Sequence, residues 1–271
     1  MFECVINLSE GRDAPRLGAL RTTGGASLRD LHADAFHNRS VFTLINDAGQ
    51  LSRDVHELLG AAFTSLDLTR HEGVHPRFGV VDVVPFVALQ PNDAHEAVAL
   101  RDETATWIAD SFQVPVFLYG PVGGVIRTLP EVRKTAFRTL MPDKGPKSAP
   151  ATLGASAVGA RDVLVAWNLW LRGVTLHEAR AIARAVRRIE VRALALQVGN
   201  QVQVSCNLVA PLVLGPSAVF DQVAALLPAR GSIERAELVG LAPRALLALE
   251  DRPRWSQLDL SEERTIESRL G

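Results

Sequence analysis

This chain of 271 residues contains few cysteines and has almost no net charge. Its two cysteines, Cys4 and Cys206, lie far apart in apolar, strand-like settings and have no CxxC partner. That pattern favours small buried hydrophobic residues over a disulfide or a nucleophile. A formal net charge of -1 argues against a nucleic-acid partner, because such binders normally carry a basic patch. We therefore expect the partners to be small molecules or further copies of this chain.

Long apolar runs are also missing. No stretch approaches the roughly 18 uninterrupted apolar residues of a membrane span, and the N-terminus lacks a basic region followed by an apolar run. We expect no membrane partner, no signal peptide and a cytoplasmic location. With 47% hydrophobic and 22% charged residues, the composition is that of an ordinary globular protein, and the length suffices for one large domain or two small ones.

The most informative segment that is present is residues 71–79, HEGVHPRFG, which leads into an apolar stretch. Its first five residues satisfy H-E-x-x-H, the pattern in which a helix presents two zinc ligands and a glutamate base. Gly73 costs about 1 kcal/mol relative to Ala inside a helix, and Pro76 disfavours the helical conformation for the residue before it. A zinc hydrolase is therefore only a minor alternative, which stoichiometric zinc would reveal.

What remains is a loop that holds His75 between a glycine and a proline. An imidazole with an unperturbed pKa of about 6.5 can carry protons near neutral pH, although many loop histidines are simply solvated. Asp82 follows on the same unit of turn and strand. It either orients or polarises an imidazole, or it is a polar residue tolerated at the end of the loop.

Hydrophobic periodicity predicts two halves of mixed structure. The first half reads as strands at 3–8, 27–34, 40–46, 80–88 and 114–119 with helices at about 12–24, 52–66 and 93–112. The second half reads as strands at 162–171, 191–198, 201–209 and 233–239 with helices at 175–188, 217–229 and 243–250. The order βαββαβ predicts an α+β fold of two ferredoxin-like, split βαβ subdomains packed across a substrate cleft.

A run rich in glycine and proline between residues 141 and 154 is typical of a domain boundary. We therefore predict an N-terminal subdomain at 1–143, a linker or ligand loop at 144–160 and a C-terminal subdomain at 161–250. The charged residues 251–271 are expected to form a surface helix or a frayed tail.

Several blocks occur in the order seen in one known family. They are ECVINLSEGR at 3–12, Asp34 with HNRSVFT at 37–43, HPRFGVVDVVPF at 75–86, LPEVRK at 129–134, the stretch from Gly145-Pro146 to GASAVGAR at 161, and QVSCNL at 203–208 with ELVGLAP at 237–243. Together they resemble the glutamate formimidoyltransferase (formiminotransferase) family over residues 3 to about 250. Nothing after them has room for the cyclodeaminase domain of some members, so a stand-alone transferase is expected.

The resemblance implies transfer of a formimino group from N-formimino-L-glutamate to tetrahydrofolate, which is a co-substrate, in histidine degradation and one-carbon metabolism. It implies no metal cofactor, and it favours a homodimer. His75 matches the family histidine that relays protons, and Asp82 is the second catalytic candidate.

The resemblance also indicates binding residues. Arg39 and Arg77 are candidates for the substrate carboxylates, because a guanidinium matches a carboxylate in two hydrogen bonds. Asn7, in the first block, is a further substrate-binding candidate. The family's folate-binding stretch falls on ten consecutive residues here: Gly145, Pro146, Lys147, Ser148, Ala149, Pro150, Ala151, Thr152, Leu153 and Gly154. The same stretch also reads as a plain domain linker.

Two alternatives to the formimino transferase stay open. One is formyl transfer between 5-formyltetrahydrofolate and glutamate, because the sequence does not separate an oxygen from a nitrogen on the transferred carbon. The other is a non-catalytic folate-binding protein. The presence of His75 argues against that second alternative, whereas Leu153, at a position where an aromatic residue is common, argues mildly for it.

Overall fold

The computed structural model describes residues 1–270 and divides into two compact units, of which the first is Met1–Asp162 and the second begins at Val163. Each unit combines one β-sheet with helices, so the predicted α+β class and the two subdomains are confirmed. The units divide after residue 162, later than the predicted end of the first subdomain at 143.

The first unit begins with a ferredoxin-like βαββαβ segment. Its elements are β1 (Phe2–Leu8), α1 (Ala14–Thr23), β2 (Leu28–Asp34), β3 (Arg39–Asn46), α2 (Ala48–Ser65) and β4 (Val81–Ala88). The four strands lie in the order β2-β3-β1-β4, and every neighbouring pair is antiparallel. This order is the split βαβ arrangement that the sequence predicts for this half.

Further elements enlarge this sheet to seven strands. They are α3 (Ala94–Phe112), β5 (Val116–Val122), β6 (Val125–Arg127), α4 (Leu129–Thr135) and β7 (Ser156–Ala160). β7 lies between β4 and β5 and is parallel to both. The last residues of the predicted linker at 144–160 therefore form a central strand of the first unit. A run rich in glycine and proline can mark a loop within a unit as readily as a boundary between two units.

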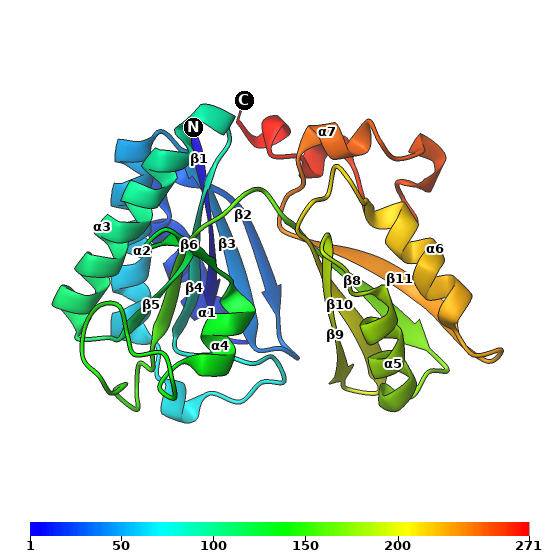
Figure 1. Ribbon diagram of the computed structural model, residues 1–271, viewed down its shortest axis with the longest axis horizontal. Coiled ribbons are helices and arrows are strands. Elements are labelled where there is room, and N and C mark those ends of the chain that lie inside the picture. The colour runs from blue at the N-terminus through cyan, green and yellow to red at the C-terminus, as the bar shows by residue number, and fades with distance from the viewer. Residues whose placement is uncertain (271) are drawn as a thin grey trace. The chain divides into compact units, whose positions relative to one another are not determined.

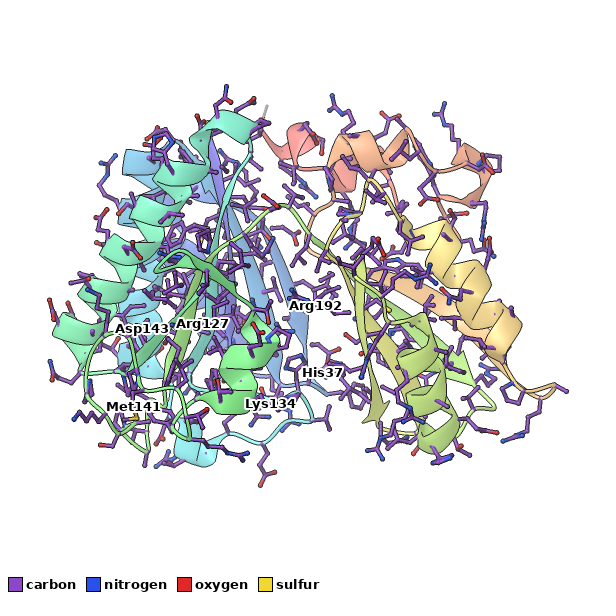
Figure 2. The ribbon with its side chains drawn as sticks, in the orientation of Figure 1. His37, Arg127, Lys134, Met141, Asp143 and Arg192 are labelled. Carbon is purple, nitrogen blue, oxygen red and sulfur yellow. The ribbon has the colours of Figure 1, made fainter. Side chains whose placement is uncertain are left out.

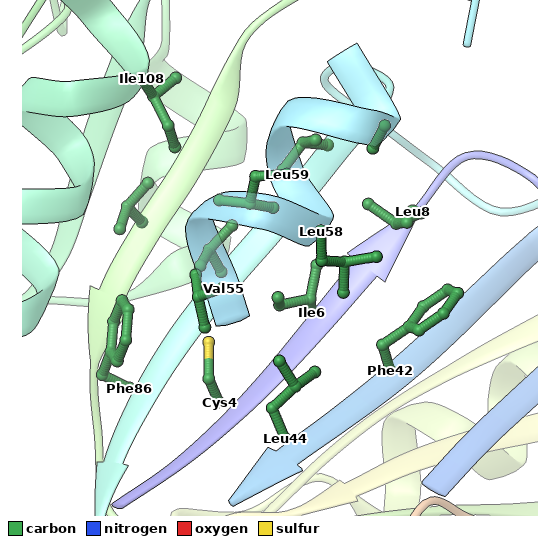
Figure 3. Packing of buried hydrophobic residues seen from close by; sticks show 14 of the residues in the cluster. Cys4, Ile6, Leu8, Phe42, Leu44, Val55, Leu58, Leu59, Phe86 and Ile108 are labelled. Atoms are coloured by element: carbon green, nitrogen blue, oxygen red, sulfur yellow. The ribbon is translucent and has the colours of Figure 1, made fainter. Parts of the chain in front are cut away.

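Successive side chains along β1 point to opposite faces of this sheet. Cys4, Ile6 and Leu8 pack with Leu58 and Leu59 of α2, as Figure 3 shows. Because side chains on a strand alternate in direction, Asn7 points to the opposite face. The short helix α4 covers part of that opposite face, since its Val132 belongs to a separate small cluster with residues of β4, β5 and β7.

The second unit repeats the ferredoxin-like order without additions to its sheet. Its elements are β8 (Val165–Arg172), α5 (Leu176–Val186), β9 (Val191–Val198), β10 (Gln201–Leu208), α6 (Pro216–Leu226) and β11 (Ser232–Val239). The strands lie in the order β11-β8-β10-β9 and are antiparallel (Figure 1). Thr175 and Glu178 form a capping box at the start of α5.

The C-terminal residues form more structure than the sequence indicates. After α7 (Arg244–Leu247) come three short 3₁₀ turns, at Arg252–Arg254, Glu262–Arg264 and Glu267–Arg269. Leu258 and Leu260 are buried in the hydrophobic cluster of the second unit, and Trp167 Nε1 donates to the carbonyl of Leu258 at 2.8 Å. A few apolar residues spaced among charges therefore anchor this segment, which the sequence leads us to expect as a surface helix or a frayed tail.

Candidate active site

Three loops of the first unit meet around the side chain of Asn38. Its Oδ1 accepts the Gly11 N–H at 2.9 Å, and its Nδ2 donates to the Glu72 carbonyl at 2.9 Å and lies 3.1 Å from His71 Nδ1. Asn38 has a φ of 48°, in the left-handed region that asparagine tolerates better than most residues. One side chain thus joins the loop after β1, the turn before β3 and the segment before β4.

The segment 71–79 packs closely against the turn before β3. A Cβ on Gly73 would overlap the carbonyl oxygen of His37, so only glycine fits there. The segment is not helical, since a 3₁₀ turn at Leu68–Arg70 ends before it. Within residues 1–270 no group of three or more His, Cys, Asp or Glu side chains is arranged to hold a metal ion.

The hydrogen bonds of His75 define its tautomer. Nδ1 lies 2.7 Å from the carbonyl oxygen of Pro76. A carbonyl only accepts, so Nδ1 carries the proton and Nε2 keeps its lone pair. Nε2 lies 3.5 Å from Nη1 of Arg39, and the His37 ring meets the imidazole edge-on with 5.9 Å between centroids.

Arg39 begins β3 and connects His75 to β1. Its Nη2 donates to Oδ1 of Asn7, whereas its buried Nε has no hydrogen-bond partner among residues 1–270. Burial lowers the pKa of Arg39 to about 10, against the opposing effect of the nearby Asp82 carboxylate. Arg39 therefore lies between Asn7 and His75 and contacts both, so three of the predicted site residues come together.

The surroundings of His75 favour its neutral form. Burial first, and the positive charge of Arg39 second, lower the pKa of His75 to about 2, with smaller contributions in the same direction from Arg133 and His37. The hydrogen bond to the Pro76 carbonyl opposes them. The imidazole thus presents an unprotonated Nε2 at neutral pH.

Asp82 does not hydrogen-bond to the imidazole. Its side chain is buried, with Oδ1 accepting the Phe78 N–H at 2.7 Å and Oδ2 pairing with Nη2 of Arg133 at 2.6 Å. Arg133 comes from α4 and is absent from the site residues predicted from the sequence. The sequence does contain a signal for the start of this helix, because Thr128 and Glu131 have the spacing of a capping box. It contains none for the contact between Arg133 and Asp82.

Arg77 directs its guanidinium into its own loop. Nη1 lies 3.4 Å from the His71 carbonyl, and Nη2 donates to the carbonyls of Gly73 and His75, the latter at 3.1 Å. The contact of Arg77 with a substrate carboxylate stays a prediction. Sequence reasoning misses the bonds within the loop because loop carbonyls that need a donor are recognisable only in three dimensions.

The predicted folate loop is fastened at both ends. At its start, Val116 N–H donates to the Lys144 carbonyl at 3.0 Å, and Asp143 pairs with Arg127 at 2.7 Å. Figure 2 labels both members of this ion pair. At its end, Val80 N–H donates to the Leu153 carbonyl at 2.9 Å and the Ala155 N–H to the Phe78 carbonyl at 3.1 Å. The loop is therefore bonded to the segment that carries His75, and most of its middle is exposed.

Within residues 1–270, no helix has both the length and the apolar character that crossing a membrane requires.

Comparison with known proteins identifies relatives. Residues 1–161 match the profile described as formiminotransferase domain, N-terminal subdomain. The chain is similar to the glutamate formimidoyltransferase of Streptococcus pyogenes serotype M1, with 34% identity over 202 residues, 69% of this chain and 68% of that protein. The glutamate formimidoyltransferase of Thermoplasma acidophilum is 34% identical over 232 residues, 77% of this chain and 76% of that protein. The formimidoyltransferase-cyclodeaminase of Sus scrofa is 30% identical over 281 residues, 91% of this chain and 51% of that protein.

Proposed function

We propose, from the premise that this chain belongs to the formiminotransferase family and is a transferase, that it moves a formimino group from N-formimino-L-glutamate to tetrahydrofolate. This reaction would place it in histidine degradation and one-carbon metabolism. The proposal rests on the geometry of His75, whose Nδ1 lies 2.7 Å from the Pro76 carbonyl oxygen and whose Nε2 lies 3.5 Å from Nη1 of Arg39.

In the proposed reaction a folate nitrogen attacks the carbon of the formimino group. As the new C–N bond forms, His75 Nε2 takes the proton from the attacking nitrogen, and a tetrahedral intermediate results. The imidazolium then gives this proton to the glutamate nitrogen, which leaves as the old C–N bond breaks. One imidazole serves both transfers, and such a relay contributes about a hundred- to ten-thousand-fold to the rate.

Arg39 is the proposed contact for a carboxylate of the donor. Its Nε has no hydrogen-bond partner among residues 1–270, and a carboxylate pairs with two nitrogens of one guanidinium. Asn7 holds Nη2 and so orients the guanidinium. A bound carboxylate would offset the charge that lowers the pKa of His75, so the imidazole becomes a better base when the donor is in place.

For tetrahydrofolate we propose the loop from Gly145 to Gly154. Its exposed Lys147 is available to the acidic tail of the folate. The hydrogen bonds at Leu153 and Ala155 keep one end of the loop next to the segment with His75. Asp82 and Arg77, which the sequence suggested for catalysis and substrate binding, are here proposed to brace that segment.

The test is an assay with purified protein. Incubation with tetrahydrofolate and N-formimino-L-glutamate, followed by acid, should yield the near-ultraviolet absorbance of methenyltetrahydrofolate, and His75→Ala should abolish it. His95→Ala, which changes an exposed histidine on α3, is the matched control and should keep the signal. Product only from 5-formyltetrahydrofolate with glutamate would replace the proposal by formyl transfer. Binding of tetrahydrofolate without turnover would indicate a non-catalytic folate-binding protein.

The homodimer and the cytoplasmic location are further proposals from the same family membership. Sedimentation equilibrium of the purified chain tests the first, since a monomer at micromolar concentration would contradict it. Fractionation of the source cells tests the second.

A further inference from the structure

We propose that Arg133 is a positioning residue whose ion pair with Asp82 holds the Phe78 end of the segment that carries His75. The inference rests on the proposed function for its kinetic consequence, but its structural content is independent of the substrate.

The carboxylate of Asp82 connects α4 to the backbone of that segment. The side chain is 3% exposed, and its two oxygens are divided between Arg133 Nη2 at 2.6 Å and the Phe78 N–H at 2.7 Å. A buried carboxylate loses its hydration, so both hydrogen bonds are needed to stabilise its charge. Removal of Arg133 therefore weakens the hold on Phe78 as well.

Arg133 also contacts Phe78 directly. The centre of its guanidinium lies 5.1 Å from the centroid of the Phe78 ring. That ring stacks on Phe117 of β5 with 5.9 Å between centroids. One arginine thus fixes the backbone N–H of Phe78 through Asp82 and the aromatic ring by a cation–π contact.

The segment is held at several points, and at the Phe78 end the carbonyl of Phe78 also accepts the Ala155 N–H at 3.1 Å. Arg133 and Asp82 add the hold on the Phe78 N–H and ring. Asn38 and the close packing of Gly73 hold its beginning, and Arg77 joins carbonyls within it. His75 lies between these restraints and Phe78. A displacement of about 1 Å at a catalytic group can cost a hundredfold in rate, so loss of one end should reduce turnover.

The experiment compares Arg133→Gln with Lys134→Gln, a neighbouring lysine that is exposed on the same helix (Figure 2). We expect Arg133→Gln to lower kcat about ten- to a hundredfold with a smaller change in KM, because the residue positions the relay. Hydrogen exchange of the Phe78 amide should become faster and the His75 ring resonances should shift. Lys134→Gln should change none of these, and Arg133→Lys should restore part of kcat.

Asp82→Asn and the double variant with Arg133→Gln complete the design. If Arg133 acts through Asp82, the double variant is no slower than Asp82→Asn alone, and it avoids leaving a buried carboxylate unpaired. A fall in kcat with an unchanged Phe78 amide would overturn the proposal and assign Arg133 a direct effect of charge. If the wild type transfers no formimino group, the proposed function fails, while the amide exchange still decides the positioning role.

Discussion

The two units share one topology, yet they differ in the connection before the last ferredoxin-like strand. In the first unit, residues 66–80 join α2 to β4 and carry His75, whereas in the second unit residues 227–231 join α6 to β11 as a short turn. The pKa shifts differ as well. Burial lowers the pKa of His75 to about 2, whereas hydrogen bonds from Thr175 lower that of Glu178, at the surface of the second unit, to about 2. The shared fold is therefore a scaffold, and the proposed chemistry lies in one long connection.

The largest effect is expected from His75→Asn, which removes the relay from that connection while keeping a side chain of similar size. Turnover should fall about a hundred- to ten-thousand-fold. The same substitution at a histidine of the second unit, His177→Asn at an exposed position of α5, should leave turnover unchanged. Steady-state kinetics on both variants measure this, and a similar loss in both would remove the distinction between the units.

Arg39→Gln should act mainly on the donor. Loss of a charged hydrogen-bonding partner, worth about 1.5–3 kcal/mol, corresponds to a rise of about ten- to a hundredfold in KM for N-formimino-L-glutamate. The KM for tetrahydrofolate should change less. Arg70→Gln, at a side chain 88% exposed just before the segment, is the control. An unchanged KM for the donor in Arg39→Gln would place its carboxylate elsewhere.

Two glycines of the first unit distinguish the packed connection from an ordinary helix surface. Gly73→Ala forces a methyl group onto the His37 carbonyl and should lower the free energy of unfolding by about 1–3 kcal/mol. Gly18→Ala in α1, where nothing lies within 4 Å of an added Cβ, should raise it by about 0.5–1 kcal/mol. Urea denaturation measures both. Equal effects of the two changes would mean that the segment is loosely packed.

The neutral His75 makes stability depend on pH. Its pKa is about 2 in the folded protein and about 6.5 in the unfolded chain. Between these values the unfolded chain binds more protons, so the free energy of unfolding decreases as pH falls from about 6.5. His75→Asn should reduce this decrease. Denaturation at about pH 7 and pH 5 tests it, and parallel pH profiles for wild type and His75→Asn would contradict the neutral imidazole.

The smallest effect compares the two capping boxes. Thr128→Ala at α4 and Thr175→Ala at α5 remove the same N-cap contacts, so each should lower the free energy of unfolding by about 1 kcal/mol. Only Thr128→Ala should also reduce turnover, because α4 carries Arg133. If the two variants are equally stable and either both or neither lose activity, then α4 does not act on the site through Arg133.

Much of the fold was predictable from the sequence, since long periodic segments such as the helix at 93–112 and the order βαββαβ in both halves agree with the structure. α4 was missed because a helix of 7 residues is too short to show an apolar stripe. β7 was missed because its small residues, SAVGA, follow a loop rich in glycine and proline and resemble its continuation.

Of the candidate site, the sequence indicated which residues to examine but not how they are connected. The contact of Arg39 with both Asn7 and His75 depends on the pairing of β3 with β1, which motif order does not reveal. Arg77 bonds to backbone carbonyls of its own segment, and Asp82 bonds to the Phe78 N–H and to Arg133 of α4; the sequence motifs indicate none of these partners. A side chain's partners are set by three-dimensional packing, so sequence motifs select candidates more reliably than they assign roles.

The most direct measurement is NMR of the His75 ring in protein labelled with ¹⁵N-histidine, assigned with His75→Asn and titrated with acid in the absence and presence of L-glutamate. The account predicts a neutral ring at neutral pH with the proton on Nδ1 and a lone pair on Nε2, and a higher pKa once glutamate occupies Arg39. A ring protonated at neutral pH, or a proton on Nε2 in the neutral form, would contradict it.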